Sequence, residues 1–245
     1  MLRLLAVIAL IAACTPPPPS PTPRPSTPTP SPIAATASAS PSATGSASPT
    51  PSARATEVAS EDRADIDGDG KPDKVTLETA WSDAAPTPAD STVRVELAIG
   101  KTLTLTLHDT VDPNLALIAD ADGDRRDEIF VRVSLGASTE FWAVVTYVDG
   151  KLAPVRVSGA DEDLTLAVGG SVTHGDGFEC RVSAAGDHEL VIRSFEQTTL
   201  TDTVYTWQAK TLIRSGSSVT QFREDMRNDP NFSAYYSARC GQPAR

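Results

Sequence analysis

Residues 129–148 (IFVRVSLGASTEFWAVVTYV) hold two alternating runs of apolar and polar side chains, rich in β-branched and aromatic residues. Alternation with a period of two is typical of half-buried strands, so we expect strands at 129–135 and 141–148. The same pattern predicts strands in four other segments: 93–99, 102–107, 189–195 and 203–213. No long segment has the 3.6-residue period of a helix. The sequence therefore predicts an all-β fold of antiparallel hairpins and meanders.

An acidic segment precedes the strand at 129, and a matching segment lies 55 residues earlier. Residues 65–73 read DIDGDGKPD and residues 120–128 read DADGDRRDE. Each segment leads into two strands, a Gly-Lys turn and a third strand, which indicates a repeated unit of about 50 residues. We place the units at about 60–110 and 115–160, with a degenerate third at 163–222 whose loop includes HGDG (174–177). Such units must stack to bury their apolar faces, either as a partial propeller or as a sandwich.

The acidic segments have the composition of a metal-binding loop. Carboxylates at alternate positions of a tight turn converge on one side, and a divalent ion removes their repulsion. Ca²⁺ suits a flexible cage of oxygen ligands better than Mg²⁺ does. The ligands that we predict in the first loop are Asp65, Asp67, Asp69 and Asp73, with the carbonyl of Lys71. In the second loop they are Asp120, Asp122, Asp124 and Glu128, with the carbonyl of Arg126. The alternative is a pair of solvated Asp-Gly turns.

The two loops differ at their sixth position, where Gly70 of the first corresponds to Arg125 of the second. If this position requires a positive φ, a residue other than glycine costs about 1 kcal/mol. We therefore expect weaker metal binding in the second loop. Asp127, at the eighth position, is expected to point outward.

For nine positions the loops resemble an EF-hand, but position 12 of the first loop is Thr76 and a strand follows in place of a helix. The pattern is more similar to the acidic loops of FG-GAP or VCBS repeats. That resemblance covers about residues 57–157. It implies calcium ligands at the five positions named in each loop.

The N-terminus has the pattern of an export signal. Residues 1–3 include a basic residue, and residues 4–13 (LLAVIALIAA) are apolar, which is too short a run for the roughly 20 residues that span a bilayer. We predict a signal peptide at 1–13, the alternative being a buried helix. The segment from Ile11 to Cys14 (IAAC) resembles the lipobox of bacterial lipoproteins. This resemblance implies a lipid on Cys14. The alternative is ordinary cleavage of the signal peptide and release of the protein into the medium.

The next residues, up to 56, are almost wholly Pro, Ser, Thr and Ala, and 13 of the 20 prolines fall within the first 51 residues. Such a composition predicts that residues 14–56 form a disordered linker that begins at the lipidated Cys14. Residues 57–245 carry 18 basic and 32 acidic side chains. This balance argues against a nucleic-acid partner. With Cys14 lipidated, Cys180 and Cys240 remain to form a disulfide. The tail at 223–245 is expected to pack onto the sheets.

The lipobox, the linker and the two acidic repeats together resemble the VCBS-repeat lipoproteins of actinobacteria. The resemblance implies a lipid-anchored protein on the outer face of the cell membrane, with a calcium-stabilised module for interaction or envelope structure. Our leading interpretation is a protein without enzymatic activity that has a protein or glycan partner at the cell surface. One alternative is a hydrolase of cell-wall or other polysaccharide, whose acid–base pair would come from carboxylates outside the loops, such as Glu140, Asp161, Glu162 and Asp163. Another is a module that binds a soluble ligand for a membrane partner.

Overall fold

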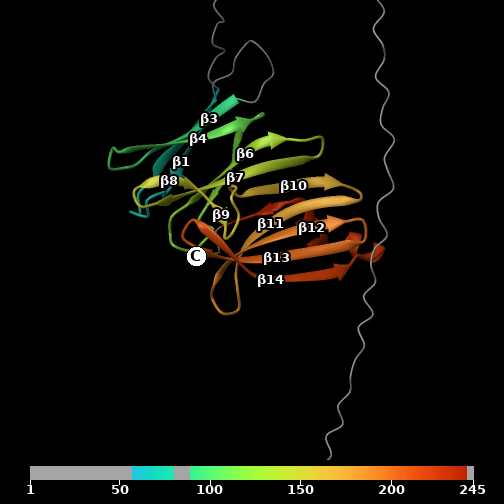
Figure 1. Ribbon diagram of the computed structural model, residues 1–245. Helices are drawn as coiled ribbons and strands as arrows, with labels where there is room; N and C mark the ends of the chain where they lie inside the picture. The colour runs from blue at the N-terminus through green and yellow to red at the C-terminus, as the bar shows by residue number, and fades with distance from the viewer. Residues whose placement is uncertain (1–56, 80–88, 242–245) are drawn as a thin grey trace, which may run out of the picture. The chain divides into compact units, whose positions relative to one another are not determined.

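Antiparallel sheets make up most of the computed structural model, which describes residues 57–79 and 89–241 (Figure 1). The predicted all-β fold is confirmed. The predicted signal peptide, the lipidated Cys14 and the linker lie outside the described residues. Within the described part of the chain, no helix combines the length and the apolar character that crossing a membrane requires.

The first sheet is a four-stranded antiparallel meander in the order β1-β2-β3-β4. Its strands are β1 (Glu57–Ala64), β2 (Asp73–Thr79), β3 (Ala89–Glu96) and β4 (Thr102–Thr110). The first acidic loop joins β1 to β2. Alternating side chains of β2 and β3, such as Val75, Leu77, Val93 and Val95, are at most 2% exposed, as the apolar periodicity requires.

The second sheet begins with a meander that repeats this connectivity. It contains β5 (Asn114–Ala119), β6 (Glu128–Leu135), β7 (Thr139–Val148) and β8 (Lys151–Pro154), and the second acidic loop joins β5 to β6. Each unit is therefore four strands with its loop after the first. Sequence analysis predicted only the three strands that follow the loop.

The second sheet continues from β7 into a five-stranded meander, drawn side by side in yellow to red in Figure 1. Its strands are β10 (Thr165–Ser171), β11 (His174–Val182), β12 (His188–Glu196), β13 (Thr199–Gln208) and β14 (Thr211–Gln221). The short β9 (Arg156–Val157) pairs in parallel with β14. The N-terminal half of β7 pairs with β10 and its C-terminal half pairs with β8.

Two predictions within this meander were wrong. HGDG (174–177) is the start of β11 and forms no acidic loop, so the third unit does not repeat the first two. The segment 203–213 is two strands rather than one, because the chain turns at Ala209 and Lys210. Ala209 adopts a φ of +49° there without the glycine or asparagine that normally marks such a turn.

The units bury their apolar faces in two cores, and strands β6 and β7 contribute to both. Ile129 and Val131 of β6 pack with the first sheet, while Phe130 between them faces the opposite core. That second core is formed with β10 to β14 and includes Phe178, which stacks on Phe130 with ring centroids 5.6 Å apart. The first two units are therefore stacked face to face.

The tail packs onto β10, β11 and β12 through the short 3₁₀ helix η2 (Pro230–Tyr236) and the short strand β15 (Ala238–Arg239), and a second 3₁₀ helix, η1 (Glu224–Asn228), contacts η2. The glycines of HGDG make room for it. A Cβ on Gly175 would lie 2.6 Å from the ring of Tyr236, and one on Gly177 would overlap the carbonyl oxygen of Ala234. A disulfide between Cys180 and Cys240 ties the tail to β11, as predicted.

Candidate metal centre

The first acidic loop brings three of its predicted ligands together. Asp65, Asp67 and Asp73 each offer a carboxylate oxygen, and these oxygens lie within 4.8 Å of one another. Asp69 is outside this group. Its carboxylate accepts hydrogen bonds from the backbone N–H and the side-chain Nζ of Lys71, at 2.8 and 3.2 Å. The first loop could therefore hold a metal ion through the three clustered carboxylates.

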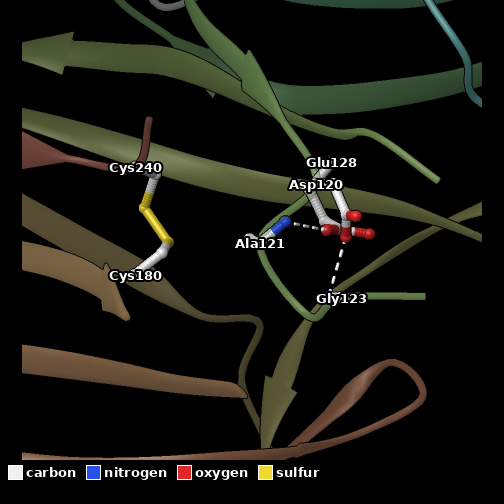
Figure 2. Close-up of a disulfide and its surroundings, with 6 residues drawn as sticks. All are labelled: Asp120, Ala121, Gly123, Glu128, Cys180 and Cys240. Carbon is white, nitrogen blue, oxygen red and sulfur yellow. Dashed lines mark hydrogen bonds between the residues drawn. A yellow bond between two sulfur atoms is a disulfide. The ribbon is translucent and has the colours of Figure 1, made fainter. Parts of the chain in front are cut away.

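The second loop clusters Asp120, Asp122 and Asp124 within the same 4.8 Å limit. Glu128 is not in this group, although its carboxylate lies beside that of Asp120 (Figure 2). It is fully buried and accepts hydrogen bonds from the backbone N–H of Ala121 and the hydroxyl of Thr146, both at 2.9 Å. The second loop could likewise hold a metal ion.

Two internal hydrogen bonds occur at the same positions in both loops. The N–H at position 6 donates to the first aspartate, at 3.0 Å from Gly70 to Asp65 and 3.2 Å from Arg125 to Asp120. The N–H at position 7 donates to the aspartate at position 5, at 2.8 Å in both loops. The repeat that is visible in the sequence is therefore also present in the loop geometry.

The carboxylate at position 9 closes each loop. Asp73 accepts from the N–H of Ile66 at 2.9 Å and Glu128 accepts from the N–H of Ala121 at the same distance. Asp73 also accepts from Ala98 N–H at 2.8 Å, which links the loop to the turn after β3. This closing role was not apparent from the sequence, where both residues were predicted only as ligands.

The sixth position has a positive φ in both loops, as the sequence suggested. It is +80° at Gly70 and +71° at Arg125. A left-handed conformation at a residue with a Cβ costs about 1 kcal/mol, so the second loop is more strained than the first.

Burial and neighbouring charges disfavour the charged form of two carboxylates of the second loop. Burial, with the charges of Asp124 and Asp120, raises the pKa of Asp122 to about 6. Burial and the charge of Asp122 raise the pKa of Glu128 well above its usual range. In the first loop, Asp65 has a buried Oδ1 with no hydrogen-bond partner among the residues that the structure describes. A bound cation would satisfy that oxygen and offset the repulsion.

Asp127 is the residue that sequence analysis misplaced. It was expected to point outward, but its Oδ2 accepts a hydrogen bond from the N–H of Asp65, at 2.8 Å, in the other loop. Its own N–H donates to the carbonyl of Asp65 at 2.9 Å. No signal in the sequence could have shown this contact, because it depends on the stacking of the two units.

The carboxylates considered for a hydrolase are paired with neighbouring side chains or exposed to solvent. Glu140 pairs with Arg132 at 3.3 Å and accepts from the indole N–H of Trp142 at 2.9 Å, whereas Asp163 pairs with Arg156 at 2.7 Å. Asp161 and Glu162 are exposed.

One cavity among the described residues, of about 140 Å³, lies between η2 and β13 and is lined by Leu200, Thr220, Met226, Asp229, Asn231, Phe232 and Tyr235. Another, of about 80 Å³, lies between the second loop and the disulfide. Neither cavity brings together two carboxylates from outside the loops.

No protein-family model, curated protein or solved structure matches the chain. The geometry of the two acidic loops is therefore the basis on which a function is proposed.

Proposed function

We propose that the chain is a lipid-anchored bacterial surface protein that presents a calcium-stabilised β-sheet module for interaction or envelope structure, without enzymatic activity. The pair of acidic loops is the observation that carries the proposal. Two loops that share their position 6 and position 7 hydrogen bonds, and that each bring three carboxylates together, support a shared requirement for a cation.

Calcium is the ion that fits the donor set best. Every candidate side-chain donor is a carboxylate oxygen, and Ca²⁺ accepts six to eight oxygens in flexible arrangements, whereas Mg²⁺ requires a strict octahedron. Asp65, Asp67 and Asp73 would form one site, to which Asp69 and the Lys71 carbonyl can add after small movements. Asp120, Asp122 and Asp124 would form the other, with Glu128 and the Arg126 carbonyl. The ion's role is structural, because the loops join strands that carry both cores.

Calcium titration tests the metal proposal. The full chain is expected to bind two Ca²⁺ in an isothermal titration at physiological salt, with a stronger first-loop site because only the second loop carries the strained Arg125. Asp67→Asn and Asp122→Asn should each remove one equivalent. As a matched control, Asp161→Asn removes an exposed carboxylate outside the loops and should leave two. No binding, or a preference for Mg²⁺, would contradict the proposal.

Cell fractionation tests the anchor. The resemblance of IAAC to a lipobox motivates the expectation that Cys14→Ser moves the protein from the membrane fraction to the soluble fraction or the medium. Several acyl chains bind far more tightly than the marginal attachment of one chain, so the shift should be nearly complete. Cys180→Ser, which removes a cysteine from the folded body, should leave the protein on the membrane. A Cys14→Ser variant that stays membrane-bound would overturn the anchor.

A further inference from the structure

We infer that the two acidic loops bind their ions cooperatively, and that Asp127 and Arg126 of the second loop are the residues that couple them. The inference rests on the proposed binding of calcium and concerns its regulation. Neither residue was expected to contact the first loop.

The backbones of the two loops are joined directly. The N–H of Asp65 donates to Oδ2 of Asp127 at 2.8 Å, and the N–H of Asp127 donates to the carbonyl of Asp65 at 2.9 Å. These residues are 62 positions apart in the chain. Asp65 is the first predicted ligand of its loop, and it also carries the buried oxygen without a partner. The contact therefore holds the backbone of a ligand.

Arg126 makes a second connection. A Cβ added to Gly68 would lie only 3.0 Å from the Cγ of Arg126, so the Arg126 side chain packs against the apex of the first loop. Its Nη1 is 3.3 Å from Oδ2 of Asp124, a clustered carboxylate of its own loop. Its guanidinium lies over the ring of Tyr147, 5.6 Å from the centroid. One side chain thus contacts both loops and is fixed by a neighbouring strand.

These contacts predict positive coupling. Asp127 lies between Arg126 and Glu128, the seventh and ninth positions of the second loop, so an ion that orders this segment also orders Asp127. Asp65 is then held in place before the first loop binds, and less conformational entropy is lost on binding there. Repulsion between the two ions acts in the opposite direction. At physiological salt it is screened over about 8 Å, whereas the direct hydrogen bonds are not.

Calcium titrations of the full chain at physiological salt measure the coupling. Asp122→Asn disables the second loop and should weaken binding at the first loop by about fivefold or more, relative to its affinity in the intact protein. Asp67→Asn should weaken the second loop by the same factor, because coupling between two binding sites is reciprocal. The amide side chains retain the short hydrogen bonds within each loop, which limits structural damage.

Variants of Asp127 test whether this residue couples the two loops. Asp127→Ala should leave two equivalents bound but reduce the coupling, because it removes the acceptor of the Asp65 N–H while the backbone hydrogen bond and the Arg126 contact remain. Asp127→Asn keeps a side-chain oxygen that can accept from the N–H of Asp65, so this variant should retain the coupling. Asp161→Ala is the control for loss of a carboxylate. Two calcium ions bound with independent affinities in the wild type would overturn the inference but leave the proposed function intact, whereas no calcium binding would overturn both.

Discussion

Asp73→Ala is expected to lower the free energy of unfolding by about 4 kcal/mol, even in metal-free buffer. Asp73 is 1% exposed, and its two carboxylate oxygens accept from the N–H groups of Ile66 and Ala98 at 2.9 and 2.8 Å. Alanine would leave both donors without an acceptor, and each buried unsatisfied donor costs about 1–3 kcal/mol. The loss is therefore structural and separate from that of a metal ligand.

Isosteric amide substitutions distinguish the structural contributions of Asp73 and Glu128, the two carboxylates that close the loops. Asp73→Asn retains one acceptor and directs an NH₂ group at the other backbone donor, so it should cost about 2 kcal/mol. Glu128→Gln should cost less than about 1 kcal/mol, because the hydroxyl of Thr146 can rotate to accept from the new NH₂ group. Ala121 then still has its acceptor in the amide oxygen.

Urea unfolding in EGTA measures these differences without a contribution from calcium. Asp161→Asn provides the surface control and should stay within about 0.5 kcal/mol of the wild type. Equal losses for Asp73→Asn and Glu128→Gln would show that the backbone N–H groups facing Asp73 do not set the cost.

The sequence was sufficient for the loops and for most of the strands that carry the cores. Asp65 to Asp73 and Asp120 to Glu128 are recognisable because the spacing of carboxylates and glycines is local, and a tight turn converts local spacing directly into geometry. Alternation also located β6 and β7, and the unbroken apolar runs at 129–131 and 141–145 are explained by the burial of side chains on both faces of these strands. The strain at Arg125 could also be expected, because Arg125 occupies the sixth position of its loop, where the first loop has Gly70.

The remaining features depend on tertiary contacts between parts of the chain that are distant in sequence. Asp127 contacts Asp65 only because the first two units stack, and no local pattern encodes that contact. HGDG resembles an acidic loop, but its glycines serve the close approach of η2, and His174 and Asp176 lie 2.6 Å apart on one strand. The turn at Ala209 forms without a glycine because the pairing of β13 with β14 overrides the local conformational preference of alanine.

Removal of calcium with EGTA is expected to lower the melting temperature by about 10 °C or more. At an extracellular concentration of about 1 mM and a Kd of about 10 μM, each occupied loop stabilises the fold by about 2.7 kcal/mol. Two loops would give about 5 kcal/mol, and each kcal/mol changes the melting temperature of a domain of this size by about 2–4 °C. When calcium is removed, the clustered carboxylates of Asp120, Asp122 and Asp124 repel one another, although Arg126 still pairs with Asp124 at 3.3 Å.

The double variant Asp67→Asn, Asp122→Asn distinguishes metal binding from other effects of the chelator. It should melt at a temperature that EGTA does not change, because neither loop retains its full set of carboxylates. Excess Mg²⁺ should not restore the wild-type melt. Each ion closes a connection between the first two strands of a stacked unit, and these strands contribute to the core between the two units, so loss of the ions should shift one cooperative transition. A wild-type melt that EGTA leaves unchanged would refute the calcium-stabilised module, and the acidic loops would then be solvated turns.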